Sequence, residues 1–287
     1  MNIEQEISKL FEEGQYELVI KKCKELIPSE KLNMLYLIMG LSESNLQNHL
    51  GAIESFTEYI KLECTDISGY LQRGISKMDL QQYESAIDDF TKVIELNTFY
   101  SGGYYWRGVL KFEIKDFEGA IKDFTALIKL DPKDFSAYYF RAKAYDHIQF
   151  YNKAIEDYNK AIELEPNSAD YYFNRGLTYY SINNYEKALK DYLKTLELDP
   201  KHSFAYCNIG CIKHSSNEIS TAINYYTKAI QLNSTIADFF YRRGLAYYDI
   251  GAYKNALDDY NKILELEPDN EEVRDCINKC LQELNEQ

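Results

Sequence analysis

The sequence lacks the features that mark several large classes of protein. No apolar run approaches the roughly 18 consecutive residues that a membrane-spanning helix needs, so we expect no membrane span. The N-terminal stretch MNIEQEISKLFEEG alternates charged and apolar residues, and it lacks the basic start and apolar core of a signal peptide. Basic residues are also few, with 32 Lys and Arg against 46 Asp and Glu and a net charge of −14.

This acidic balance restricts the partners that the chain can take. A protein that binds nucleic acid needs a stripe of basic residues to displace counterions, and the sequence shows none. An acidic surface is also unfavourable beside anionic membranes and favourable beside cationic or neutral molecules. We therefore expect no nucleic acid and no membrane as partner, and a neutral or basic protein or peptide instead.

Cysteine and histidine are scarce, and their arrangement excludes further classes. The six cysteines occur singly or four residues apart, which is not the spacing of a disulfide framework. A reducing compartment is the simpler interpretation, so we expect the protein in the cytoplasm. Only four histidines occur, and no Gly-rich phosphate loop, nucleophile elbow or HExxH motif is present. The sequence therefore predicts a protein that is not an enzyme and uses no cofactor.

What the sequence does contain is a segment that recurs at a fixed interval of 34 residues. One copy reads AIEDYNKAIELEP, at 154–166, and the seven copies begin at Ala52, Ala86, Ala120, Ala154, Ala188, Ala222 and Ala256. Each alanine is followed four residues later by an aromatic residue: Phe56, Phe90, Phe124, Tyr158, Tyr192, Tyr226 and Tyr260. Small residues allow two helices to touch, and large rings fill the space beside the contact.

The first half of each unit pairs a large and a small residue in the same way. An aromatic residue is followed four places later by Gly40, Gly74, Gly108, Ala142, Gly176, Gly210 or Gly244. Glycine inside a helix costs up to about 1 kcal/mol relative to alanine, so its recurrence indicates close contact between helices. Apolar spacings of three and four predict a helix in both halves. Prolines such as Pro132 and Pro166 mark where the second helix ends.

This pattern of aromatic, Gly, Ala, aromatic and Pro resembles the tetratricopeptide repeat. The segments YYFNRGLTYY, NNYEKALKDY and ELDP within residues 171–200 carry the resemblance most fully. It implies an all-α fold, a right-handed α–α superhelix of stacked antiparallel helix hairpins. We expect one solenoid domain over residues 1–287. Its units would be 1–32 (degenerate), 33–66, 67–100, 101–134, 135–168, 169–202, 203–236 and 237–270, followed by a capping helix at 271–287.

A charge pair recurs within the units. Arginine in the seventh place has aspartate 16 residues later in five pairs: Arg73–Asp89, Arg107–Asp123, Arg141–Asp157, Arg175–Asp191 and Arg243–Asp259. Where Ile209 replaces the arginine, Tyr225 replaces the aspartate, and Met39 is matched by Ser55 in the same way. The two places change together, so we predict an ion pair between the two helices of a hairpin. The alternative is a row of arginines that binds anionic ligands.

In stacked hairpins the first helices line the inner, concave surface. Rings with polar tips on that surface suit peptide recognition, because they supply contact area at low entropic cost. The sequence therefore predicts a scaffold or adaptor that binds a peptide segment of a partner protein, and self-association through the same rings stays open. The candidate peptide-binding residues are Tyr105, Trp106, Phe112, Tyr139, Phe140, Lys143, Phe173, Asn174, Tyr180, Asn208, Tyr241, Arg242 and Tyr248. The competing interpretation is that these rings only pack against neighbouring hairpins.

A second function is possible on the first helix of unit 203–236. Cys207, Cys211 and His214 are four and three residues apart, which places them on one face of the predicted helix. Thiolate and imidazole are zinc ligands, although a closed structural site needs four of them and the fourth is not evident. The alternative function is thus a metal or small-ligand sensor centred on these three residues.

Overall fold

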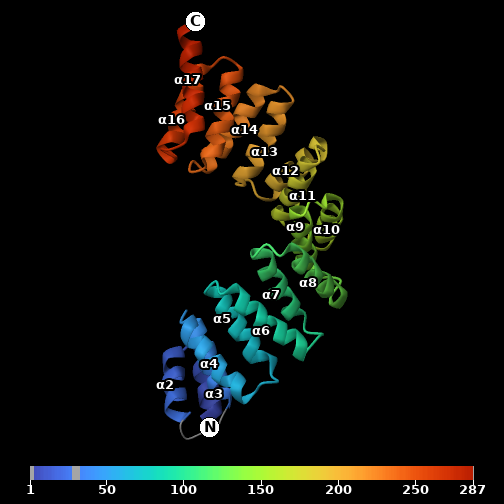
Figure 1. Ribbon diagram of the computed structural model, residues 1–287, viewed down its shortest axis with the longest axis vertical. Coiled ribbons are helices and arrows are strands. Elements are labelled where there is room, and N and C mark those ends of the chain that lie inside the picture. Colours follow the sequence, from blue (N-terminus) through green and yellow to red (C-terminus); the bar gives the residue numbers. More distant parts are fainter. Residues whose placement is uncertain (1–2, 28–32, 287) are drawn as a thin grey trace. The chain divides into compact units, whose positions relative to one another are not determined.

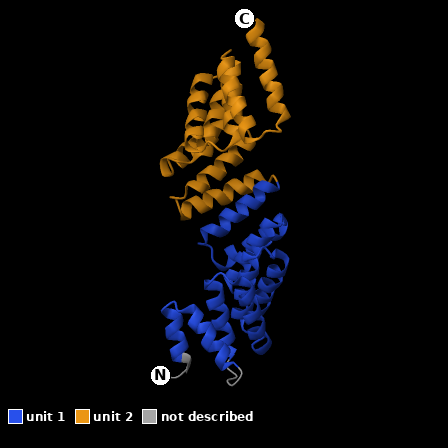
Figure 2. Ribbon diagram, turned by 90° about the vertical axis from the view of Figure 1, so that its left-hand side faces the viewer, with its two compact units in different colours: residues 1–148 blue, residues 149–287 orange. Residues whose placement is uncertain are grey.

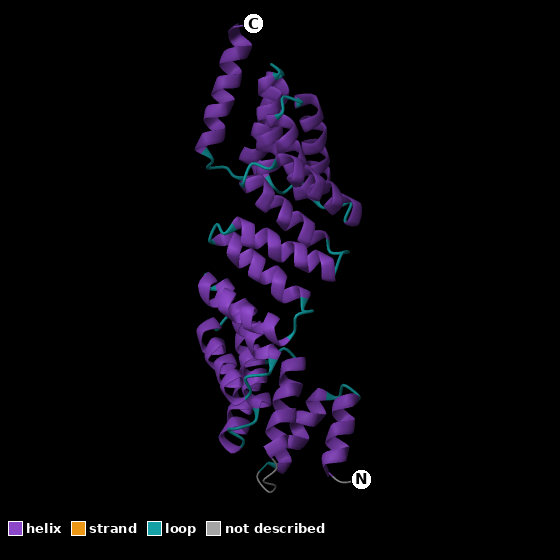
Figure 3. Cartoon of the chain, turned by 90° about the vertical axis from the view of Figure 1, so that its right-hand side faces the viewer, coloured by secondary structure: helices purple, strands orange, loops and turns teal. Residues whose placement is uncertain are grey.

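The computed structural model describes residues 3–27 and 33–286. Parts of the predicted unit 1–32 and the last residue of the predicted cap therefore lie outside the described residues. Within the described ranges the regular structure is helical and no strand occurs, which confirms the all-α fold class (Figure 3). Among these helices none combines the length and the apolar character that crossing a membrane requires.

The chain divides into two compact units, residues 1–148 and 149–287, with the division inside the predicted repeat 135–168 (Figure 2). Unit 1 contains α1 (Ile3–Glu12), α2 (Tyr16–Leu26), α3 (Asn33–Asn45), α4 (His49–Leu62), α5 (Ile67–Asp79), α6 (Tyr83–Leu96), α7 (Ser101–Glu113), α8 (Phe117–Leu130) and α9 (Phe135–His147). Unit 2 contains α10 (Tyr151–Leu164), α11 (Ala169–Ser181), α12 (Tyr185–Leu198), α13 (Ser203–Ser215), α14 (Ile219–Leu232), α15 (Ala237–Asp249), α16 (Tyr253–Leu266) and α17 (Glu271–Glu286) (Figure 1).

Within each unit, consecutive helices pack as hairpins. The hairpins α3–α4, α5–α6 and α7–α8 form in unit 1, and α11–α12, α13–α14 and α15–α16 form in unit 2. The first helices of successive hairpins also meet, because α7 contacts α9 and α13 contacts α15. The predicted hairpin architecture is confirmed, and it places the first helices of a unit beside one another.

The turns inside the hairpins share one backbone feature. Seven of them have a residue with positive φ at the same place in the repeat. These residues are Gln47, Gln81, Lys115, Gln149, Asn183, Asn217 and Gly251, with φ between 58° and 72°. In the α7–α8 turn, Asp116 follows this residue, and its side chain accepts a hydrogen bond of 3.0 Å from the backbone N–H of Gly119, which caps α8. The sharp turn and the cap together fix where the second helix begins.

The repeated small and aromatic residues form the core. Ala120 and Phe124 of α8 are fully buried. A Cβ atom on Gly108 of α7 would lie 3.0 Å from the Phe124 ring, closer than ordinary van der Waals contact. The recurring glycine therefore marks close contact between the two helices of a hairpin, as the sequence predicts.

Candidate functional site

The arginine–aspartate pairs are structural ion pairs. Arg107 donates from Nε and Nη2 to Asp123 at 2.9 and 2.6 Å, so the pair is bidentate. The same geometry joins Arg73 to Asp89, Arg175 to Asp191 and Arg243 to Asp259. The Asp123 side chain is only 4% exposed. In these four hairpins the predicted link between the two helices is confirmed, and the arginines are engaged within the fold.

Each of these arginines makes a third contact that the sequence analysis missed. Arg107 also donates from Nη1 to the Thr91 hydroxyl at 3.1 Å, on α6 of the preceding hairpin. The same contact is made by Thr57 to Arg73, Thr125 to Arg141, Asn159 to Arg175 and Thr227 to Arg243. The sequence does hold a sign of this third contact, because the place of the threonine, 16 residues before Ile209, is occupied by Leu193. In this unit the places of threonine, arginine and aspartate are therefore all taken by less polar residues, Leu193, Ile209 and Tyr225.

Six candidate peptide-binding residues lie on α7 and α9 of unit 1, and we call them the α7–α9 aromatic surface: Tyr105, Trp106, Phe112, Tyr139, Phe140 and Lys143. The centroid of the Tyr105 ring lies 5.1 Å from that of Trp106 and 6.0 Å from that of Phe140. The Tyr139 and Phe140 rings are 5.4 Å apart. The structure therefore joins side chains from two successive first helices into one continuous set of rings.

Lys143 lies among these rings. Its Nζ is 5.0 Å from the centroid of Phe112, 5.6 Å from that of Tyr139 and 5.7 Å from that of Phe140. These distances are typical of cation–π contacts, which hold the ammonium group over the ring faces. The surface thus combines aromatic area with one positive charge.

The rings also pack inward, as the competing interpretation requires. Phe140 stacks on the fully buried Phe124 at 5.7 Å, and Trp106 stacks on the fully buried Phe90 at 6.5 Å. Yet all six residues of the surface keep part of their area exposed, since each is half-buried. Each ring therefore has one side against the core and part of its surface in solvent.

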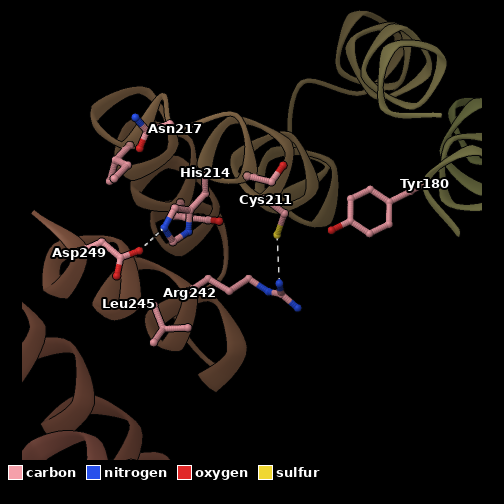
Figure 4. Close-up of a pocket in the computed structure, with 10 residues that line it drawn as sticks. Tyr180, Cys211, His214, Asn217, Arg242, Leu245 and Asp249 are labelled. Carbon is pink, nitrogen blue, oxygen red and sulfur yellow. Dashed lines mark hydrogen bonds and ion pairs between the residues drawn. The ribbon is translucent and has the colours of Figure 1, made fainter. Parts of the chain in front are cut away.

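Unit 2 has a hollow of about 370 Å³ between α11, α13, α14 and α15, which we call the unit 2 hollow (Figure 4). It is lined by Tyr180, Cys211, His214, Ser215, Asn217, Ile219, Tyr226, Arg242, Leu245 and Asp249. Of the candidate peptide-binding residues, Tyr180 and Arg242 line it. They come from α11 and α15, so the fold brings together first-helix residues from separate hairpins.

Three polar contacts organise this hollow. The Arg242 guanidinium donates from Nη1 to Cys211 Sγ at 3.1 Å and from Nε to Asp238 at 2.6 Å. His214 Nε2 lies 2.7 Å from a carboxylate oxygen of Asp249 (Figure 4). Cationic, acidic and thiol groups therefore border one open space.

The remaining candidates in unit 2 lie outside the hollow. The Phe173 ring is 4.3 Å from that of His202, and Asn174 donates to the backbone oxygen of Asp170 at 2.7 Å. The Tyr241 hydroxyl donates to Glu272 of α17 at 2.8 Å, which raises the pKa of Tyr241 to about 12. Tyr248 packs on Tyr253 at 5.2 Å. These four and Asn208 are half-buried, as are Tyr180 and Arg242.

The predicted metal-ligand set is not assembled. In the described part of the chain, no three His, Cys, Asp or Glu side chains are placed to hold a metal ion. Cys207 is only 2% exposed, because it packs into a core cluster that includes Phe239 of α15. Cys211 and His214 instead contact Arg242 and Asp249. The metal half of the alternative function therefore has no support in this arrangement.

Hairpins of near-identical helices with one repeating core define an α-helical repeat protein. Three family models match the chain: one described as TPR repeat at residues 150–183 and 210–251, and two described as Tetratricopeptide repeat at 169–202 and 237–270 and at 71–135. The chain belongs to the tetratricopeptide repeat family. No curated protein matches it in sequence.

Solved structures share the fold. MamA from Desulfovibrio magneticus RS-1 is 25% identical, with a TM-score of 0.58 over 60% of this chain and 98% of that one. The C-terminal part of a TPR repeat-containing protein from Cytophaga hutchinsonii is 20% identical, with a TM-score of 0.69 over 84% of this chain and 99% of that one. YrrB, a TPR protein with an unusual peptide-binding site, is 20% identical, with a TM-score of 0.54 over 63% of this chain and 94% of that one.

Membership in this family assigns the chain to a broad functional class. Its repeats are those of protein–protein interaction scaffolds, which are not enzymes. The chain is therefore a protein-interaction scaffold, as the sequence predicts.

Proposed function

We propose that the scaffold binds a peptide segment of a partner protein along the first helices of its hairpins. The observation that carries this proposal is the burial of the candidate residues: all thirteen are half-buried, and none is fully buried or fully exposed. Side chains fixed on one side and open on the other offer a rigid surface, so little entropy is lost when a peptide binds. YrrB, which has the same fold, is described as having a peptide-binding site.

The chemistry of the two units favours an extended partner with apolar and polar side chains. The α7–α9 aromatic surface offers ring area around Lys143, and the unit 2 hollow offers Arg242, His214 and Asp249. The net charge of −14 favours approach by a neutral or basic segment over an acidic one. Each unit would bind part of a partner through its own first helices.

Peptide selection from a random library against the full chain tests the proposal. Selected peptides are expected to contain aromatic or apolar residues with an excess of Lys and Arg. Tyr139→Ala in unit 1 or Phe173→Ala in unit 2 should weaken binding of a selected peptide about tenfold or more, which corresponds to about 1.4 kcal/mol. Affinity is measured by calorimetry on variants whose helical circular dichroism matches the wild type.

Phe99→Ala is the matched control. Phe99 is 81% exposed in the loop before α7, so it is a solvent-exposed ring outside the proposed surface. Its removal should leave peptide affinity unchanged. If the selected peptides bind Tyr139→Ala and Phe173→Ala as tightly as the wild type, or lose affinity with Phe99→Ala, the binding surface lies elsewhere.

A further inference from the structure

One nucleophilic group borders the unit 2 hollow and has no role in the proposed peptide contacts. Cys211 of α13 lines the hollow, and its Sγ lies 3.1 Å from Arg242 Nη1 on α15 (Figure 4). The residue is 9% exposed, and it borders this open space. A small molecule that enters the hollow would meet the sulfur beside a guanidinium group.

The surroundings of Cys211 favour its thiolate. A hydrogen bond from Cys207 and then the positive charge of Arg242 lower the pKa of Cys211, against the opposing effect of burial, and the Tyr226 hydroxyl donates a further hydrogen bond. The titratable and charged groups around the sulfur are Cys207 and His214 on α13, Tyr180 on α11, Tyr192 on α12, Tyr226 on α14, and Asp238, Arg242 and Asp249 on α15. Arg242 is the positive group in direct contact.

The other cysteines have different environments. Burial raises the pKa of Cys23 to about 11, and it also raises the pKa values of Cys276 and Cys280. The pKa of Cys207 is raised mainly because its proton is held in the hydrogen bond to Cys211. Cys64 is exposed, so it serves as an internal reference for an accessible thiol. Thiolate character and access to a cavity therefore coincide at Cys211.

We propose that Cys211 is a site of reversible mixed-disulfide formation with a low-molecular-weight disulfide, and that the adduct lies in the unit 2 hollow. The Cys211 thiolate attacks one sulfur of the disulfide, the S–S bond of the reagent breaks, and a new S–S bond forms to Cys211. The leaving thiolate takes a proton from water, so the reagent is the oxidant and is reduced by the reaction. Excess free thiol reverses the same exchange.

The geometry favours an adduct over an internal disulfide. Residues four apart on a helix hold their Cβ atoms about 5–6 Å apart, whereas a disulfide requires about 3.5–4.5 Å. Cys207 and Cys211 have this spacing on the continuous helix α13. The hollow of about 370 Å³ is also of the size that holds small organic ligands.

Incubation of the full chain carrying Cys64→Ser with oxidised glutathione tests the proposal. We expect one adduct per chain, located at Cys211 by peptide mapping and released by dithiothreitol. The rate should rise with pH to a plateau that is reached below the pH at which an ordinary thiol ionises, which has a pKa of about 8.5. The parent chain, which keeps the exposed Cys64, gives the rate of modification of an accessible cysteine for comparison.

Arg242→Leu removes the adjacent charge, and it should slow the reaction at pH 6.5 by about tenfold for each unit by which the raised pKa of Cys211 then exceeds 6.5. At pH 9.5 the difference should largely vanish. Arg242→Lys should retain most of the rate, and Arg274→Leu, which removes a positive charge on α17, should have no effect. Modification of another cysteine, an internal Cys207–Cys211 disulfide, absence of an adduct, or equal rates of Arg242→Leu and wild type at pH 6.5 would each overturn the assignment. If Arg242→Leu does not fold, the pH profile at Cys211 decides by itself.

Discussion

At the scale of single residues, one arginine in each typical unit holds three helices together. Arg175 of α11 donates two hydrogen bonds to Asp191 of α12 and one of 2.6 Å to Asn159 of α10. Its side chain is 17% exposed and that of Asp191 only 5%. A charge with so little access to water depends on its partner, because desolvation without pairing is costly.

Asp191→Leu should therefore lower the free energy of unfolding by about 3–5 kcal/mol, because it leaves the Arg175 guanidinium largely buried without its carboxylate. Adding Arg175→Ile to this variant should restore part of the loss, because the unpaired charge is removed as well. The chain itself contains such an apolar pair, Ile209 with Tyr225. Urea unfolding of both single variants and the double variant checks the prediction, and losses that simply sum would refute the coupling.

The sequence could predict these pairs because two of the three partners are charged and change together. The contact of Thr91 with Arg107 could not be predicted, because a threonine on a helix surface is not distinguished in sequence from other polar surface residues. The sequence places Cys207 on one helix face with Cys211 and His214, but its small side chain fits into the core beside Phe239. The contact between Arg242 and Cys211 joins residues 31 apart on separate hairpins, and no local pattern reveals it.

At the scale of the element, the hairpin turns whose positive-φ residue has a Cβ atom carry a backbone strain. A residue with a Cβ atom loses about 1–2 kcal/mol in the left-handed region, and Gln81 has φ of 58° there. Gly251 occupies the equivalent place in the last hairpin, with φ of 72°. The repeat signature could predict the length of these turns. It could not predict their backbone conformation, because glutamine and lysine do not favour positive φ.

Gln81→Gly should raise the free energy of unfolding by about 0.5–1 kcal/mol, because the relief of strain exceeds the entropic cost of glycine. Gly251→Gln should lower it by a similar amount. Thermal and urea unfolding of both variants measure the effect. Gln82→Gly is the matched control, since Gln82 has φ of −85° and glycine relieves no left-handed backbone conformation there. A rise with Gln82→Gly as large as that with Gln81→Gly would contradict the explanation.

At the scale of the whole molecule, stability in such a chain is built from contacts between neighbours. At the C-terminal end, α17 covers the last hairpin by burying Val273 and Cys280 in a cluster with Tyr260 and Ile263. Arg107 and Arg175 each contact a threonine or asparagine 16 residues earlier, in the preceding hairpin, and an aspartate 16 residues later, in their own hairpin. The sequence could predict the stacking of hairpins, but it could not predict the division into two compact units, because the repeat continues through residue 148 unchanged.

Removal of residues 67–100 should leave a folded protein. The deletion places Arg107 in the register of Arg73, so Thr57 of α4 meets it at the same spacing of 16 residues. Removal of residues 203–236 should be more damaging, because it places Arg243 opposite Leu193. Circular dichroism and urea unfolding of the two shortened chains check this, and equal stability would show that the arginine contact does not determine which hairpins can adjoin.

The constant spacing of this three-part contact makes hairpins interchangeable wherever threonine, arginine and aspartate keep their places. A gene that encodes such a chain can therefore gain or lose 34 codons in one event, and the hairpins that become adjacent still form the threonine–arginine–aspartate contact. Two junctions lack this contact, since Leu193, Ile209 and Tyr225 occupy its three places in one and Cys23, Met39 and Ser55 in the other. A hairpin that carries the arginine contact does not match either junction, so these two places restrict the order of the hairpins beside them.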